Sequence, residues 1–133
     1  MEKVPNNVDL VFNLGVISSN NKDPKGAEKY YLRAIEINPN YANAYFNLSA
    51  LKIDESQVLL EQMNKLGTST ADNKKYEALK KQRDAILEVV VKHLEKTISL
   101  DDKNTPAKTT LVSVYNALEM TDKAKALKAT IKE

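Results

Sequence analysis

The sequence predicts an all-α protein built from repeated pairs of helices, and two observations lead to this prediction. The first is composition: the 133 residues include only 3 glycines and 4 prolines, whereas alanine, leucine, lysine and glutamate are plentiful. Those four residue types favour helices, and few glycines and prolines means few tight turns. The second is a recurrence, because the triplet Phe-Asn-Leu at 12–14 returns at 46–48, 34 residues later. A fixed period of this length is typical of stacked helical repeats.

Length and charge limit the classes of function. The chain has the size of one domain, and its 42% apolar and 29% charged residues are typical of a protein with a packed core. The net charge of +2 is too small for a phosphate-binding surface, so no nucleic-acid partner is predicted. No stretch approaches the roughly 18 apolar residues of a membrane span, so no membrane insertion is predicted.

The first repeat covers residues 8–41, and its small and large residues have physical reasons. Gly15 and Ala27 are small, which allows two antiparallel helices to approach closely. Tyr31 is bulky and is expected to fill the space beside them. Pro39 cannot continue a helix and is expected to end the second one. The sequence therefore predicts a helical hairpin.

The second repeat is longer than the first. It is expected to cover 42–104, which is 29 residues more than a regular repeat. The additional residues fall at about 53–89, where apolar residues recur at helical spacing on either side of a turn at 67–73. We therefore expect both helices to run on for roughly three extra turns and to form an arm. The third repeat follows at 105–133.

These residues and spacings resemble the tetratricopeptide repeat family over nearly the whole chain. The resemblance implies a single domain, 1–133, of about six helices, in which antiparallel hairpins stack into a right-handed superhelix with an elongated second hairpin. It also implies a concave groove, lined by the first helix of each repeat, that binds an extended peptide or a partner's helix. Family members are mostly non-catalytic binding modules.

The resemblance also implies which side chains face the groove. They are Asp9, Phe12, Asn13, Val16 and Ser19 in the first repeat, Asn43, Phe46, Asn47 and Ala50 in the second, and Thr109, Thr110, Ser113 and Asn116 in the third. Asn13 and Asn47 occupy the same slot, and primary amides there can hold a peptide backbone because they both donate and accept hydrogen bonds. Phe12 and Phe46 would add apolar contacts. The alternative is that these residues serve only helix packing and solvation.

One departure from the family concerns members that clamp a terminal carboxylate. Four of the slots that would carry the clamp's polar and basic residues hold other residue types, namely Phe12, Val16, Pro106 and Thr110. Only Asn47 fits such a clamp, so it is not predicted here.

No pattern in the sequence indicates catalysis. The single histidine, His93, has no second histidine and no cysteine with which to share a metal ion. The sequence contains no glycine-rich phosphate loop, and no serine has an evident histidine base. We therefore predict no enzymatic activity, no metal site and no cofactor.

Two functions stay open from the sequence. The first is a protein-protein interaction module that binds a peptide or protein in its groove. The second is a structural or oligomerisation element that pairs with another copy through the arm or the ends of the array. The sequence does not determine the compartment. The cytoplasm is expected by default, and an extracytoplasmic location is the alternative if the chain is a piece of a longer protein.

The two ends carry expectations of their own. Residues 4–7 have the same frame as 38–41, which resembles the tail of a preceding repeat and favours a piece of a longer array. The alternative is a natural start that uses Pro5 as a helix-entry residue. Residues 122–133 are expected to form a capping helix with lysines on its outer face.

Overall fold

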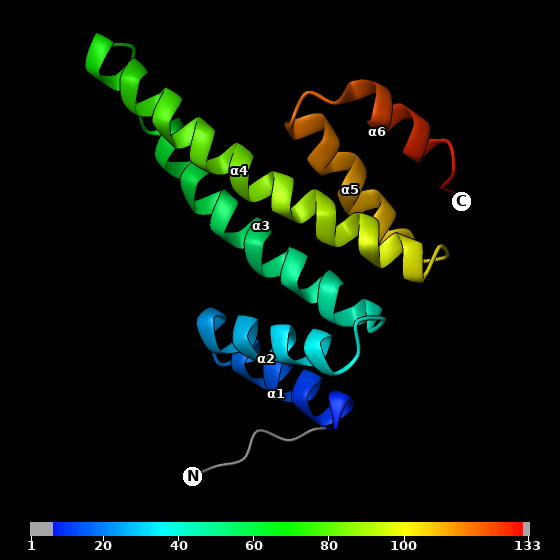
Figure 1. Cartoon of the computed structure of the whole chain (residues 1–133). Helices are drawn as coiled ribbons and strands as arrows, with labels where there is room; N and C mark the ends of the chain where they lie inside the picture. Colours follow the sequence, from blue (N-terminus) through cyan, green and yellow to red (C-terminus); the bar gives the residue numbers. More distant parts are fainter. Residues whose placement is uncertain (1–6, 132–133) are drawn as a thin grey trace.

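The computed structural model describes residues 7–131, and within this range it contains six α-helices and no strand. Figure 1 shows them as three successive antiparallel hairpins, with the long α3 and α4 crossing the middle of the molecule. The prediction of an all-α repeat fold with an elongated second hairpin is confirmed. The helices are α1 (Val8–Asn20), α2 (Pro24–Ile37), α3 (Ala42–Asn64), α4 (Thr70–Leu100), α5 (Thr105–Ala117) and α6 (Thr121–Lys128).

Polar side chains define where four of these helices begin. The side chain of Asp23 accepts a hydrogen bond from the Gly26 amide at 3.0 Å, and Pro24 occupies the first helical position, where an amide hydrogen is not needed. Asn104 caps α5 in the same way, through the Ala107 amide at 3.0 Å. The caps of the remaining two are Asn7 for α1 and Ser69 for α4.

The turn at the tip of the arm is shorter than predicted. The sequence predicts a turn at 67–73, but α4 already begins at Thr70. The reason is that Ser69 accepts a hydrogen bond from the Asp72 amide, while the Asp72 carboxylate accepts one from the Gly67 amide. These two bonds satisfy amides at the start of the helix and allow it to begin early.

The core consists of two clusters of buried side chains. The N-terminal cluster is formed by Val11, Ala27, Tyr31, Ala34, Ala44, Leu48 and Leu51, which come from α1, α2 and α3. The C-terminal cluster is formed by Leu87, Val90, Val91, Leu94, Ala107, Leu111, Val114, Tyr115 and Ala124, which come from α4, α5 and α6. The long hairpin therefore joins the two clusters, since α3 contributes to the first and α4 to the second.

The same face of the first helix is buried in two repeats and open in the other. In α3 it consists of Ala44, Leu48 and Leu51, and in α5 of Ala107, Leu111 and Val114, all of them buried. These faces pack against α2 and α4, the second helices of the preceding hairpins. The equivalent residues of α1 are Leu10, Leu14 and Ile17, and Leu10 and Ile17 are 49% and 54% exposed. No described helix covers this face of α1.

Two expectations about the ends fall partly outside the described range. The proposed repeat tail begins at residues 4–6, which lie outside it. The predicted C-terminal helix at 122–133 corresponds to α6, which begins at Thr121 and ends at Lys128, and residues 132 and 133 lie outside the described range.

The close approach of α1 and α2 at Gly15 leads to a stability prediction. A Cβ atom on Gly15 would lie 2.5 Å from Cε1 and 2.7 Å from Cδ1 of the buried Tyr31 ring. Gly15→Ala is therefore expected to destabilise the fold by about 1–3 kcal/mol, as overpacked cores do. In an open helix position, glycine to alanine stabilises by about 0.5–1 kcal/mol. Urea denaturation of the variant therefore tests the contact: a lower free energy of unfolding supports it, and a higher one contradicts it. The double variant with Tyr31→Leu should lose less than the sum of the two single changes, whereas simple additivity would contradict the contact.

Candidate binding groove

The groove positions lie on α1, α3 and α5, and the structure divides them into two sets by exposure. Asp9, Asn13, Ser19, Asn43, Ala50, Thr109, Ser113 and Asn116 are exposed. Phe12, Val16, Phe46, Asn47 and Thr110 are partly buried. Most of the polar positions are therefore accessible to solvent, and the large apolar ones, Phe12, Val16 and Phe46, are engaged in packing.

Phe12 is part of an aromatic group within the first repeat. Its ring centroid lies 5.6 Å from that of Tyr31 and 5.2 Å from that of Tyr41, in tilted arrangements that aromatic pairs favour. Val16 packs against the same N-terminal cluster. Both side chains are therefore partly exposed and partly packed against the core.

Phe46 lies on α3 but packs against the C-terminal cluster formed by α4, α5 and α6. Phe46 is therefore partly engaged in the packing of the core. Replacing Phe46 is therefore expected to lower stability, which differs from the expectation for a free groove residue. Its neighbour Asn47 is the better probe of the groove.

Asn47 is held in place by the core residue next to it. Its side-chain amide donates a hydrogen bond to the Tyr31 hydroxyl at 3.3 Å. Among residues 7–131, the Asn47 side-chain oxygen has no hydrogen-bond partner, and neither has the side chain of Asn13. The two equivalent amides therefore keep hydrogen-bonding capacity for a ligand.

Asp9 has an internal partner. The Tyr41 hydroxyl donates a hydrogen bond to Asp9 Oδ1 at 2.8 Å, which links the start of α1 to the residue that precedes α3. Burial raises the pKa of Tyr41 to about 12, and the hydrogen bond and negative charge of Asp9 add to the shift. Asp9 therefore contributes to the packing of the first two repeats as well as to the exposed surface.

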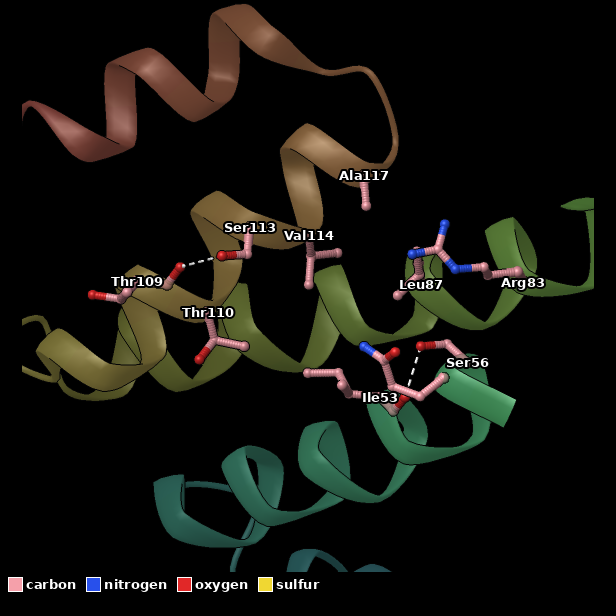
Figure 2. A pocket seen from close by; sticks show the side chains of 10 residues that line it. Ile53, Ser56, Arg83, Leu87, Thr109, Thr110, Ser113, Val114 and Ala117 are labelled. Atoms are coloured by element: carbon pink, nitrogen blue, oxygen red, sulfur yellow. Dashed lines mark hydrogen bonds between the residues drawn. The ribbon is translucent and has the colours of Figure 1, made fainter. Parts of the chain in front are cut away.

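At the third repeat the groove contains a cleft of about 240 Å³ between α3, α4 and α5 (Figure 2). Thr110 and Ser113 line it, and their hydroxyls donate to backbone carbonyls one turn earlier, at 2.8 and 3.4 Å. The other lining residues are Ile53, Ser56, Gln57, Arg83, Leu87, Thr109, Val114 and Ala117. Five of these, Ile53, Ser56, Gln57, Arg83 and Leu87, belong to the arm segment and were not predicted, because the inserted residues have no counterpart in the repeat register.

Comparison with known families agrees with the hairpin pattern. Two family models match the chain, and both describe tetratricopeptide repeats, one over residues 8–41 and the other over residues 30–71. The chain is a tetratricopeptide repeat protein. In this family, repeats generally act as scaffolds for protein-protein interaction. The matched ranges end at the beginning of α4, so neither model covers most of that helix or the third hairpin.

Solved structures of MamA are similar to this tetratricopeptide repeat protein over most of its length, at low identity. MamA 41-end from Desulfovibrio magneticus RS-1 is 19% identical over 96% of this chain and 79% of that chain, with a TM-score of 0.39. Another crystal structure of MamA is 21% identical over 95% of this chain and 72% of that chain, with a TM-score of 0.36. A comparison with curated proteins found no match.

The lone histidine of this tetratricopeptide repeat protein lies at the contact between α3 and α4. His93 is partly buried, with its ring centroid 6.2 Å from that of Tyr45, and burial together with the positive charge of Lys52 lowers its pKa. Within residues 7–131, no three His, Cys, Asp or Glu side chains are grouped so as to hold a metal ion. In the same range, none of the helices combines the length and apolar character needed to cross a membrane.

The Asp9–Tyr41 pair predicts a pH dependence. The raised pKa means that Tyr41 keeps its proton in the native state between pH 10 and about 12, whereas it loses the proton in the unfolded chain. The free energy of unfolding should therefore fall as the pH rises through that window. Asp9→Asn should bring the pKa of Tyr41 closer to 10 and weaken the loss. The measurement is phenolate absorbance, with Tyr41→Phe to identify the signal and Asp54→Asn as a control for removing an exposed carboxylate. An unchanged Tyr41 titration in Asp9→Asn would contradict the pair.

Proposed function

We propose that this chain is a non-catalytic interaction module that binds an extended segment of a partner protein along α1, α3 and α5. One observation carries the proposal: Asn13 and Asn47 occupy the same slot of successive repeats and keep unused hydrogen-bonding capacity on the groove side. Two amides at the repeat spacing can each accept from and donate to a peptide backbone. Such contacts hold an extended chain without depending on its side chains.

The surroundings of Asn47 support this reading. The bond from its amide to the Tyr31 hydroxyl limits the rotation of the side chain before any ligand arrives. A pre-oriented amide loses less side-chain entropy on binding than a free one, which favours affinity. The asparagine of the second repeat is therefore expected to contribute more than the freely exposed Asn13.

The chemistry of the groove favours binding over catalysis. Its polar positions are amides, hydroxyls and one carboxylate, and that carboxylate, Asp9, is already bonded to Tyr41. None of the serines or threonines of the groove has a histidine beside it to act as a base, since His93 contacts Tyr45 on the α3–α4 interface. With a net charge of +2 and no patch of aromatic and basic residues in the groove, we propose a protein partner and no nucleic-acid partner.

The proposal is tested with linear peptides selected on the full chain from a displayed random library. Asn47→Ala is expected to weaken the selected peptides about tenfold, because one or two backbone hydrogen bonds of about 1 kcal/mol each are lost. Asn13→Ala should weaken them less. Asn64→Ala, which changes an exposed asparagine at the tip of the arm, is the matched control and should leave affinity unchanged.

Thermal unfolding of each variant separates binding from folding. Asn47→Ala should retain a melting temperature close to that of the parent chain, since only its long hydrogen bond to Tyr31 is removed. Equal affinities for Asn47→Ala, Asn13→Ala and the control would rule out the groove as the binding surface.

A second function is favoured by a different observation. The open apolar face of α1, formed by Leu10, Leu14 and Ile17, is the counterpart of faces that are buried against a neighbouring hairpin in α3 and α5. Covering apolar surface of this kind with another helix is favourable, because it removes the surface from water. A second copy of the chain would then pair at this end of the array, as a structural or oligomerisation element.

Light scattering at increasing protein concentration tests this second function. Pairing predicts a mass that rises toward that of a dimer and that Ile17→Lys returns to the monomer value. Leu32→Lys is the matched control, because Leu32 is 45% exposed on α2 and lies outside the α1 face. A monomer mass at every concentration, or equal effects of the two substitutions, would exclude pairing through α1.

A further inference from the structure

The cleft between α3, α4 and α5 continues the proposed groove toward the arm. Gln57 lies seven residues beyond Ala50 on α3, so both are on the same face of that helix two turns apart. On α5 the cleft is lined by Thr110 and Ser113, which are groove positions of the third repeat. A segment bound along α1, α3 and α5 would therefore pass over this cleft.

Arg83 reaches this cleft from the arm portion of α4. Figure 2 shows Arg83 among the side chains that line the cleft, with Leu87 from the same helix and Ala117 from the end of α5. The Nε atom is buried and has no hydrogen-bond partner, and in the part of the chain that the structure describes it is the one buried side-chain nitrogen or oxygen in this situation. Buried donors without an acceptor are rare in proteins, so this Nε atom is a place where an acceptor from outside the chain would be favourable.

The charge of Arg83 is not balanced within the cleft. Of the ten lining residues, Arg83 is the one with an ionisable side chain. Its neighbour in sequence, Asp84, forms an ion pair with Lys80 at 3.0 Å. Arg83 itself forms no ion pair within residues 7–131. The cleft therefore presents one positive charge at every physiological pH, because arginine does not lose its proton.

The remaining walls are mainly apolar. Leu87 and Val114 are buried beneath the cleft, and Ile53 and Ala117 complete its sides. A group that fills this space should combine one negative charge with an aliphatic portion. A glutamate side chain has both, with two methylene groups that can lie on the apolar walls while its carboxylate accepts from the guanidinium.

We propose that the cleft is a subsite for an acidic side chain, preferentially glutamate, of the partner segment, and that Arg83 is its anchor; this rests on the proposed groove function. The guanidinium donates from Nε and a terminal nitrogen to the two carboxylate oxygens, a geometry that arginine forms and lysine does not. The source of the carboxylate is a side chain within the segment. A terminal carboxylate is not proposed, because the slots of a terminal clamp hold Phe12, Val16, Pro106 and Thr110.

The chain allows a direct spectroscopic test on the unmodified protein. It contains two arginines, Arg33 and Arg83, so its Nε–H region has two signals. The probe is N-acetylglutamate α-amide, compared with N-acetylglutamine α-amide, which has the same shape without the charge. The Arg83 signal should shift on titration with the glutamate probe and not with the glutamine probe. Arg33, which pairs with Glu36 at 3.0 Å, serves as the internal reference.

Peptides selected from the random library provide the second measurement. They should be enriched in glutamate next to an apolar residue, and replacing that glutamate by glutamine should weaken binding at least tenfold. Arg83→Met should weaken the parent peptide by a similar factor and leave the glutamine peptide unaffected. Arg83→Lys should recover only part of the affinity, because the charge returns without the Nε–H donor. Amidation of the peptide's C-terminus should have no effect, and a large loss would assign the site to a terminal carboxylate and overturn the proposal.

The control variant is Lys81→Met, which removes one exposed positive charge from the same helix outside the cleft. It should change affinity less than twofold. Equal losses for Arg83→Met and Lys81→Met would mean a general charge effect and would overturn the proposal. So would an Arg83 signal that shifts no more than that of Arg33.

The outcomes separate this inference from the function on which it rests. Peptide binding that needs Asn47 but is indifferent to Arg83 would leave the groove function standing and remove the acidic subsite. An Arg83 signal that responds to the glutamate probe, together with selected peptides that are indifferent to Asn47, would remove the groove function and leave a carboxylate site in the cleft.

Discussion

The rest of the structure depends on one packing contact that is repeated along the chain. The first helix of a hairpin buries a face of alanine, leucine and another aliphatic residue against the second helix of the hairpin before it. Ala44, Leu48 and Leu51 do so against α2, and Ala107, Leu111 and Val114 do so against α4. Because this face is buried, the adjacent face of the same helix must point away from the core. The exposed polar positions of these helices, such as Asn13 and Ser113, therefore follow from the core positions through one helical period.

The elongated hairpin changes the geometry of this array without interrupting it. Helices α3 and α4 are 23 and 31 residues long, yet the contact that α5 makes with α4 reproduces the contact that α3 makes with α2. The additional residues lie beyond these contacts, toward the tip of the arm (Figure 1). They bring Gln57 and Arg83 beside the third repeat, at a place where a regular repeat would have ended. The insertion thus adds a charged side chain to the proposed groove, whose other positions are uncharged apart from Asp9.

Coupling between the repeats comes from a few side chains at their boundaries. Tyr41, the residue that precedes α3, connects to Asp9 by a hydrogen bond and to Phe12 by ring contact, and so ties the start of α3 to α1. Lys52 lies 3.3 Å from both Glu28 on α2 and Glu55 on its own helix. Phe46 on α3 packs against the C-terminal cluster, which α4 shares with α5 and α6 of the third repeat. In repeat proteins, such nearest-neighbour contacts decide how far the array folds as a unit.

The sequence by itself determined the hairpins, because their signals are local. The small residues Gly15 and Ala27, the cap at Asp23 and the stop at Pro39 act over one or two helical turns, and the structure has the predicted helices in the first repeat and in the arm. The start of α4 was misjudged by a few residues because the cap at Ser69 competes with the rest of a polar run. Tertiary structure alone decided that Phe46 packs against the C-terminal cluster and that Arg83 reaches the cleft. Both depend on how the helices cross in space, and residues in an insertion have no repeat register from which that crossing could be predicted.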